Sequence, residues 1–177
     1  MLGGKLTIAG FDPIGSPQYG TYYQLENNEW QTYSGLPCGQ HNFDLIEFDN
    51  KIFAGIGANR GLTPIAYSND GKIFERAEMI KDGKQIDTTG GECIRTYNFF
   101  ILNDELYAEL WYENMTEKRL YSQIYKYQDG KFYFHSDLVN SLNTAAEGSQ
   151  NMPPIFAKEE LNGKIFLTTS FLYSTND

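Results

Sequence analysis

The chain has 177 residues, of which 41% are hydrophobic and 15% aromatic, and its formal net charge is -9. This length suits one domain with its own core, and the excess of carboxylates argues against nucleic acid or an anionic membrane as a partner. No apolar run reaches the roughly 20 residues of a membrane span, and the N-terminus lacks an export signal. These features predict a soluble chain of unknown compartment.

Four short segments share one pattern, in which an apolar residue is followed by two turn formers, a charged residue and an apolar run. They begin at residues 2, 48, 102 and 161, so successive copies are 46, 54 and 59 residues apart. Asn, Asp and Gly tolerate left-handed backbone, and a pair of them between extended segments predicts a two-residue β-hairpin. A period near 50 residues that contains several strands is typical of propeller blades.

The predicted strands follow these turns along the chain, and few windows show the period of an amphipathic helix. The first repeat has strands at 5–11, 21–25 and 29–33, and the second at 41–48, 51–56, 65–68 and 72–76. The third has strands at 94–102, 105–112, 120–127 and 131–135, and the fourth at 155–161 and from 164 onward.

These elements predict an all-β, β-propeller-like fold with about three blades of four-stranded antiparallel sheet. Residues 1–177 form a single domain of repeats at about 1–34, 41–78, 93–137 and 154–177. Because propellers close with typically 4 to 8 blades, three blades leave edges that invite pairing with another chain. The chain is then a part of a longer propeller, a protomer that closes the propeller as a homodimer, or an open irregular sheet.

The longer connections all fall between the second and third strands of a repeat or between repeats. In an up-and-down blade these connections share one face. We expect a functional site on this face, because long loops in compact domains are more often functional or mobile than not. The predicted long-loop face consists of residues 11–20, 34–40, 57–64, 79–92, 113–119 and 139–154.

Several side chains on or near this face are candidates for ligand binding. Arginines can pair bidentately with carboxylates, an aromatic ring can stack on a sugar or peptide, and carboxylates can accept hydrogen bonds from hydroxyls. The candidate ligand-binding residues are His41, Arg60, Asp87, Glu92, Arg95, Trp111, Arg119 and Glu147.

The sequence predicts no catalytic residue, no metal and no cofactor. His41 lies near Cys38 and Asp44, but a nucleophile triad depends on mutual geometry that proximity in sequence does not supply. With His135 as the only other histidine, a His-rich metal site is excluded. Two of the carboxylates could flank a glycosidic bond, although a solvated acidic rim explains them as well.

The segment Tyr67-Ser68-Asn69-Asp70-Gly71-Lys72-Ile73-Phe74 resembles an Asp box, and Tyr127-Gln128-Asp129-Gly130-Lys131-Phe132 is a weaker copy. Ser68, Asp70 and Phe74 fit the Asp-box pattern, whereas Gly71 comes one position early. On these residues the chain resembles the sialidase-like, Asp-box (BNR-repeat) class of β-propellers. The resemblance implies a structural role for the box, on the side away from the active site, and it places no catalytic residue.

Together these features favour a non-catalytic binding module that uses the long-loop face for a glycan or protein ligand. A sialidase-like glycoside hydrolase or lyase is the first alternative, and a structural subdomain or assembly protomer of a larger propeller is the second.

Overall fold

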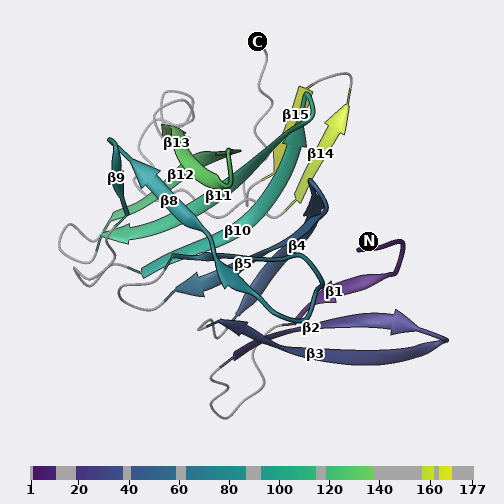
Figure 1. Ribbon diagram of the computed structural model, residues 1–177. Coiled ribbons are helices and arrows are strands. Elements are labelled where there is room, and N and C mark those ends of the chain that lie inside the picture. The colour runs from purple at the N-terminus through teal and green to yellow at the C-terminus, as the bar shows by residue number, and fades with distance from the viewer. Residues whose placement is uncertain are drawn as a thin grey trace.

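The computed structural model describes residues 2–10, 19–37, 41–58, 63–86, 93–114, 119–137, 157–161 and 164–168, and these residues form strands and turns without a helix (Figure 1). The predicted all-β class is therefore confirmed for the described chain. No described segment forms a helix that is long and apolar enough to cross a membrane.

The described strands form three sheets. The first has the order β1-β2-β3, with β1 at Thr7–Ala9, β2 at Tyr19–Glu26 and β3 at Glu29–Pro37. The third is the hairpin of β14 (Ala157–Leu161) and β15 (Lys164–Thr168). The second sheet comprises β4 (Asn42–Phe48), β5 (Lys51–Ala58), β6 (Ile65–Ser68), β7 (Glu75–Arg76), β8 (Glu78–Lys81), β9 (Lys84–Gln85), β10 (Cys93–Leu102), β11 (Glu105–Asn114), β12 (Arg119–Gln128) and β13 (Lys131–Asp137).

The second sheet curls back on itself as a half-barrel. Its order is β7-β6-β5-β10-β11-β12-β13-β8-β9, with β4 also paired to β5. The two strands β7 and β8 lie far apart in this order but are joined in the chain through Ala77, whose N–H donates to the Ile65 carbonyl at 3.0 Å. Figure 1 shows the strong bend of β10 and β11 that this closure requires.

Two strand pairings that join the repeats were not predicted. The end of β5 pairs with the start of β10, and β13 pairs in parallel with β8. Strands of the second and third repeats therefore share one sheet, whereas we predicted antiparallel pairing within each repeat. The number of blades and the propeller assignment remain predictions.

The predicted hairpin turns are confirmed where the structure describes them. Both central residues have positive φ in the turns Gly3–Gly4, Asp49–Asn50 and Asn103–Asp104, and the same holds at 27–28 and 129–130. The fourth copy, at residues 162–163, lies outside the described residues. We predicted a long loop at 79–92, but residues 78–85 form the β8–β9 hairpin around Asp82 and Gly83, and the prediction is wrong there.

The main core fills the inside of the curled sheet. Phe53, Phe99 and Phe132 are fully buried, and the ring centroids of Phe53 and Phe132 lie 5.7 Å apart. The other buried members are Ile65, Ala77, Met79, Ile94, Leu106, Ala108, Leu110 and Tyr125. Apart from Ala77, they come from β5, β6, β8, β10, β11, β12 and β13, so this one cluster holds the curl together.

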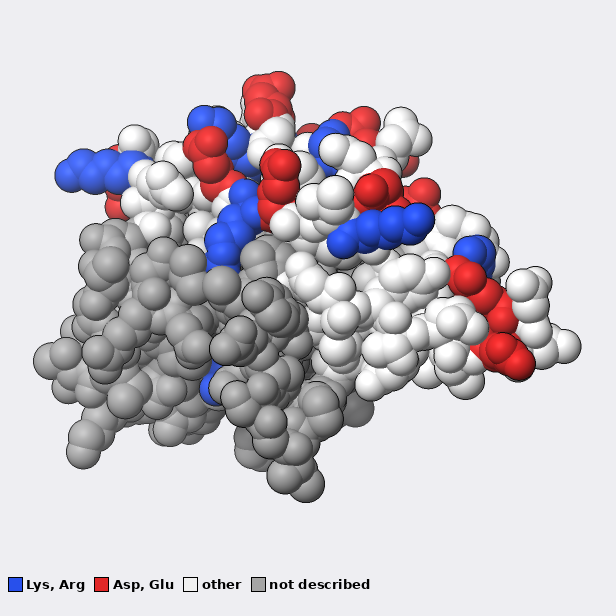
Figure 2. Space-filling view, turned by 60° about the horizontal axis from the view of Figure 1, so that its bottom comes forward, with Lys and Arg blue, Asp and Glu red and all other residues white. Residues whose placement is uncertain are grey.

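The β1–β3 sheet attaches to the outside of β5 and β6. Leu36 of β3 is buried against Ala54, Ile56 and Ala66, which form a second apolar cluster. The opposite face of the β1–β3 sheet is exposed and contains Leu6, Ile8 and Trp30, each about half exposed at 50%, 51% and 46%. Figure 2, in which the lower part of Figure 1 comes forward, shows a broad area without charged residues there.

Candidate functional site

The structure brings three of the sequence-predicted site residues together. Arg95 on β10 is paired in register with Trp111 on β11 and with Gly57 on β5. His41, directly before β4, is next to the same place, because its carbonyl accepts the Gly57 N–H at 3.2 Å. All three lie near strand ends that adjoin predicted long loops: His41 directly before β4, Arg95 near the start of β10 and Trp111 near the end of β11.

Two aromatic residues that the sequence analysis missed connect these three. Phe43 has its ring centroid 5.5 Å from that of His41 and 4.4 Å from that of Tyr97. The rings of Tyr97 and Trp111 form a T-shaped pair with centroids 5.5 Å apart, and the Arg95 guanidinium donates to the Tyr97 hydroxyl at 3.2 Å. We name His41, Phe43, Arg95, Tyr97 and Trp111 the loop-end row. Each of the five side chains is partly exposed.

The remaining predicted site residues cannot be placed against the row. Arg60, Asp87, Glu92 and Glu147 lie outside the described residues. Arg119 is the first residue of β12, and only its backbone is described, opposite Asn114 of β11.

A buried carboxylate lies two residues from Trp111 on the same strand. Glu109 is fully buried, and its two oxygens accept hydrogen bonds from Asn98 Nδ2 at 2.7 Å and Ser122 Oγ at 2.8 Å. These partners come from β10 and β12, so the carboxylate ties three neighbouring strands together. Two donors of this kind satisfy a buried carboxylate, which would otherwise be costly to bury.

The Asp-box-like segment forms a hydrogen-bonded turn between β6 and β7. Ser68 Oγ accepts the Gly71 N–H at 2.9 Å, and Asp70 Oδ1 accepts the N–H groups of Lys72 at 2.8 Å and Ile73 at 3.0 Å. The N–H of Ile73, then that of Lys72, and the Ser68 hydroxyl hold the pKa of Asp70 below its usual value. The turn takes up residues 69–74, so the strand predicted at 72–76 is wrong in its start: β7 begins at Glu75.

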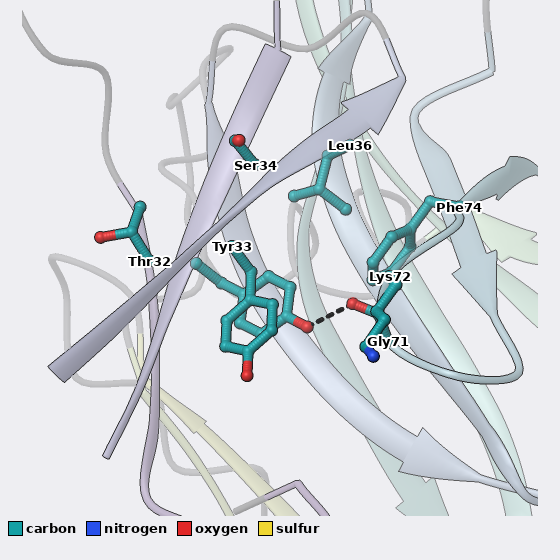
Figure 3. A pocket seen from close by; sticks show the side chains of 8 residues that line it. Thr32, Tyr33, Ser34, Leu36, Gly71, Lys72 and Phe74 are labelled. Carbon is teal, nitrogen blue, oxygen red and sulfur yellow. Dashed lines mark hydrogen bonds between the residues drawn. The ribbon is translucent and has the colours of Figure 1, made fainter. Parts of the chain in front are cut away.

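A pocket of about 310 Å³ lies between this turn and the β2–β3 hairpin (Figure 3). Its lining comprises Tyr22, Thr32, Tyr33, Ser34, Leu36, Gly71, Lys72 and Phe74. The rings of Tyr22 and Tyr33 are stacked with centroids 4.9 Å apart, and the Tyr22 hydroxyl donates to the Gly71 carbonyl. This bond connects the first sheet to the Asp-box-like turn.

Burial makes the Tyr22 hydroxyl a weaker acid than an ordinary tyrosine. The side chain is 3% exposed, and its burial, with the nearby Tyr33, Asp70 and Glu26, raises its pKa to about 12. A tyrosine in the unfolded chain has a pKa of about 10. The folded chain therefore keeps a proton that the unfolded chain releases, and this contribution to stability is complete below about pH 10 and is lost as the pH rises toward 12.

We expect the Tyr22→Phe variant to lose less stability than the wild type in this alkaline range. Between pH 9.5 and pH 12 the wild type should lose about 2–3 kcal/mol more unfolding free energy than Tyr22→Phe, since one pKa unit corresponds to about 1.4 kcal/mol. Urea unfolding of both proteins at several pH values measures it, and the other tyrosines cancel because both proteins have them. Parallel losses over this range would show that Tyr22 does not remain protonated.

Within the residues that the structure describes, no three His, Cys, Asp or Glu side chains are close enough to hold a metal ion. The loop-end row is instead aromatic with one guanidinium, a combination suited to stacking and hydrogen bonding.

Comparison of the chain with protein-family models, with curated proteins and with solved structures gives no match in any of the three.

Proposed function

We propose that this chain is a non-catalytic binding module and that its ligand, a glycan, contacts the loop-end row. The observation that carries the proposal is the contiguous set of His41, Phe43, Tyr97 and Trp111 with Arg95 beside it, at strand ends that adjoin the predicted long loops. A surface built from aromatic rings with a few polar groups is typical of ligand sites.

The chemistry of the row suits a sugar ring. The flat faces of Trp111 and Tyr97 can stack on the apolar C–H face of a pyranose. A guanidinium such as that of Arg95 is planar and has several N–H groups, a geometry that suits sugar hydroxyls and bidentate pairing with a carboxylate. The contact between Arg95 and the Tyr97 hydroxyl at 3.2 Å favours one orientation of this fork.

The propeller assignment belongs to the same proposal. The repeat spacing of 46, 54 and 59 residues supports it, as does the Ser68–Asp70 turn, whose hydrogen bonds suit the structural role of an Asp box. Closure of the propeller by a homodimer predicts a dimeric mass in solution, and a monomer would exclude that form of closure.

A glycan array probed with the purified chain tests the proposed function, and we expect binding to a restricted set of glycans. Incubation with chromogenic glycosides distinguishes the rival, a sialidase-like hydrolase or lyase, because the proposal expects no turnover. Turnover that is abolished by the change of one carboxylate would replace the binding module by the enzyme. An array without any bound glycan would leave a protein ligand or a purely structural subdomain and contradict the glycan proposal.

A further inference from the structure

Among the strands that the structure describes, β3 forms an edge of its sheet. It follows β2 through the two-residue turn Asn27–Asn28, in which both φ angles are positive, and Glu26 pairs with Glu29 across it. The pair that flanks such a turn exchanges both hydrogen bonds, and bonded and non-bonded pairs then alternate along an antiparallel ladder. Gln31 and Tyr33 therefore bond to β2, whereas the N–H and C=O groups at 30, 32 and 34 point away from it.

These outward groups have no backbone partner among the described residues. β3 ends the order of its sheet, and no backbone hydrogen bond in the described chain crosses its outer edge. Within the described chain the Asp-box-like turn lies beside this edge, where the Lys72 carbonyl oxygen would lie 4.0 Å from a Cβ placed on Gly35. Exposed edges of this kind pair readily with another extended chain.

The pocket of about 310 Å³ lies along this same edge. On one side of β3 its lining includes the rings of Tyr22, Tyr33 and Phe74, the buried side chain of Leu36 and, from the Asp-box-like turn, Gly71 and the exposed Lys72 (Figure 3). Thr32 and Ser34 border it from the other side of the strand, so the pocket reaches the edge where their backbone groups point. A strand added here would place one side chain in the pocket.

The next side chains of an added strand would lie on the opposite face. There they would lie beside Thr32 and Ser34, and a side chain further along the added strand would lie beside Trp30, which is 46% exposed, because successive side chains of a strand alternate between faces. On that face Trp30 would supply an apolar contact, in addition to the backbone hydrogen bonds.

The charge near the β3 edge indicates which kind of peptide segment would pair with it. Glu29 is exposed, lies on the same side of β3 as Tyr33 and makes no ion pair among the described residues. A side chain four positions from the pocket residue would face it, since alternate residues share a face. The net charge of -9 also favours a basic partner.

We propose that the outer edge of β3 binds an extended, basic peptide segment of a partner protein by strand addition. An aromatic or branched aliphatic side chain of the segment occupies the pocket of Tyr33, Leu36 and Phe74, and a Lys or Arg four residues away faces Glu29. Main-chain hydrogen bonds to residues 30, 32 and 34 supply affinity, and the pocket supplies the choice of side chain. This site is separate from the loop-end row and does not depend on it.

The test uses an acetylated and amidated heptapeptide library on a threonine scaffold, with the second and sixth positions varied over all amino acids. We expect the best members to combine Lys or Arg with Phe, Leu or Ile and to bind with a Kd below about 1 mM. Bound peptide should slow hydrogen exchange at the amides of Trp30, Thr32 and Ser34 by at least about tenfold, while those of Gln31 and Tyr33 are already protected. A library without a binder would overturn the proposal.

Two further experiments test whether the peptide binds through main-chain hydrogen bonds to β3. The best peptide methylated on alternate amide nitrogens should bind at least about tenfold more weakly, because it cannot donate to the edge. Thr32→Pro should have the same effect, since proline removes an outward N–H and no ladder bond, whereas Thr32→Val should bind as the wild type does. Equal binding of the methylated and unmethylated peptides would refute strand addition, even where Thr32→Pro fails to fold.

Hydrogen exchange at the same amides also shows whether a second copy of the chain occupies the β3 edge. If Trp30, Thr32 and Ser34 are protected without peptide and the chain sediments as a dimer, a second copy occupies the edge and the proposal is wrong.

Discussion

The Phe53→Ala variant is expected to lose about 3–5 kcal/mol of unfolding free energy, the usual cost of removing a fully buried phenylalanine. Phe53 is 0% exposed and lies at the centre of the core, with its ring centroid 4.9 Å from that of Tyr127, 5.7 Å from that of Phe132 and 6.4 Å from that of Phe99. These rings belong to β5, β12, β13 and β10, so the cavity would open in the core inside the curled sheet.

Urea unfolding gives the measurement, with the denaturant dependence checked for constancy between the proteins. Ile73→Ala is the matched control, because Ile73 is 72% exposed in the Asp-box-like turn and should change stability by less than about 0.5 kcal/mol. If the two variants were equally stable, β5 would not line a common core with β10, β12 and β13.

The second large effect is expected at Glu109. Glu109→Ala should cost about 3 kcal/mol or more, because it leaves the Asn98 amide and the Ser122 hydroxyl buried without this acceptor and opens a cavity. Glu109→Gln keeps the volume and one acceptor oxygen, so we expect a smaller loss of about 1–3 kcal/mol.

The exposed Glu29 supplies the control, since Glu29→Ala should stay within about 0.5 kcal/mol of the wild type. Thermal and urea unfolding of the three variants separate the outcomes. If Glu109→Ala were neutral or stabilising, the carboxylate would not stabilise the fold. Functional residues are often kept in this way at a cost in stability, and Glu109 would then be assigned to the ligand site instead of to the fold.

The turns could be predicted because their cause is local. Asn, Asp and Gly adopt positive φ at low cost, and Asp49, Asn50, Asn103 and Asp104 all do so. The Asp82–Gly83 turn has the same signal, but the short strands around it fell inside a stretch that we had assigned to a loop. The pairings of β5 with β10 and of β13 with β8 depend on contacts remote in sequence, which no local pattern specifies.

The site could be predicted only in part, for a similar reason. His41, Arg95 and Trp111 were found because each is near a strand end and is chemically distinctive. Tyr97 has the available signal of lying two residues after Arg95, and hence on its face of the strand. Phe43 has the same signal, because it lies two residues after His41. A register shift occurs at both positions, between Asn42 and Asp44 and between Thr96 and Asn98, so strict alternation fails at each.

Glu109 was missed because it was not on a predicted loop. Its neighbours Leu106, Ala108 and Leu110 are apolar and buried on the core side of β11. Strand alternation therefore places Glu109 on the opposite face, where an acid is normally expected to be exposed. Its partners Asn98 and Ser122 are remote in sequence and become neighbours only through the sheet.

The central claim is that the loop-end row binds the glycan, and the two tryptophans of the chain test it directly. Two variants are titrated with the glycan that binds most strongly on the array, and intrinsic tryptophan fluorescence is recorded. Trp30→Phe retains Trp111, and Trp111→Phe retains Trp30 on the β1–β3 sheet. We predict that the fluorescence change persists in Trp30→Phe and disappears in Trp111→Phe, and that Trp111→Ala weakens binding by about tenfold or more. A change that disappears in Trp30→Phe and persists in Trp111→Phe would contradict the account.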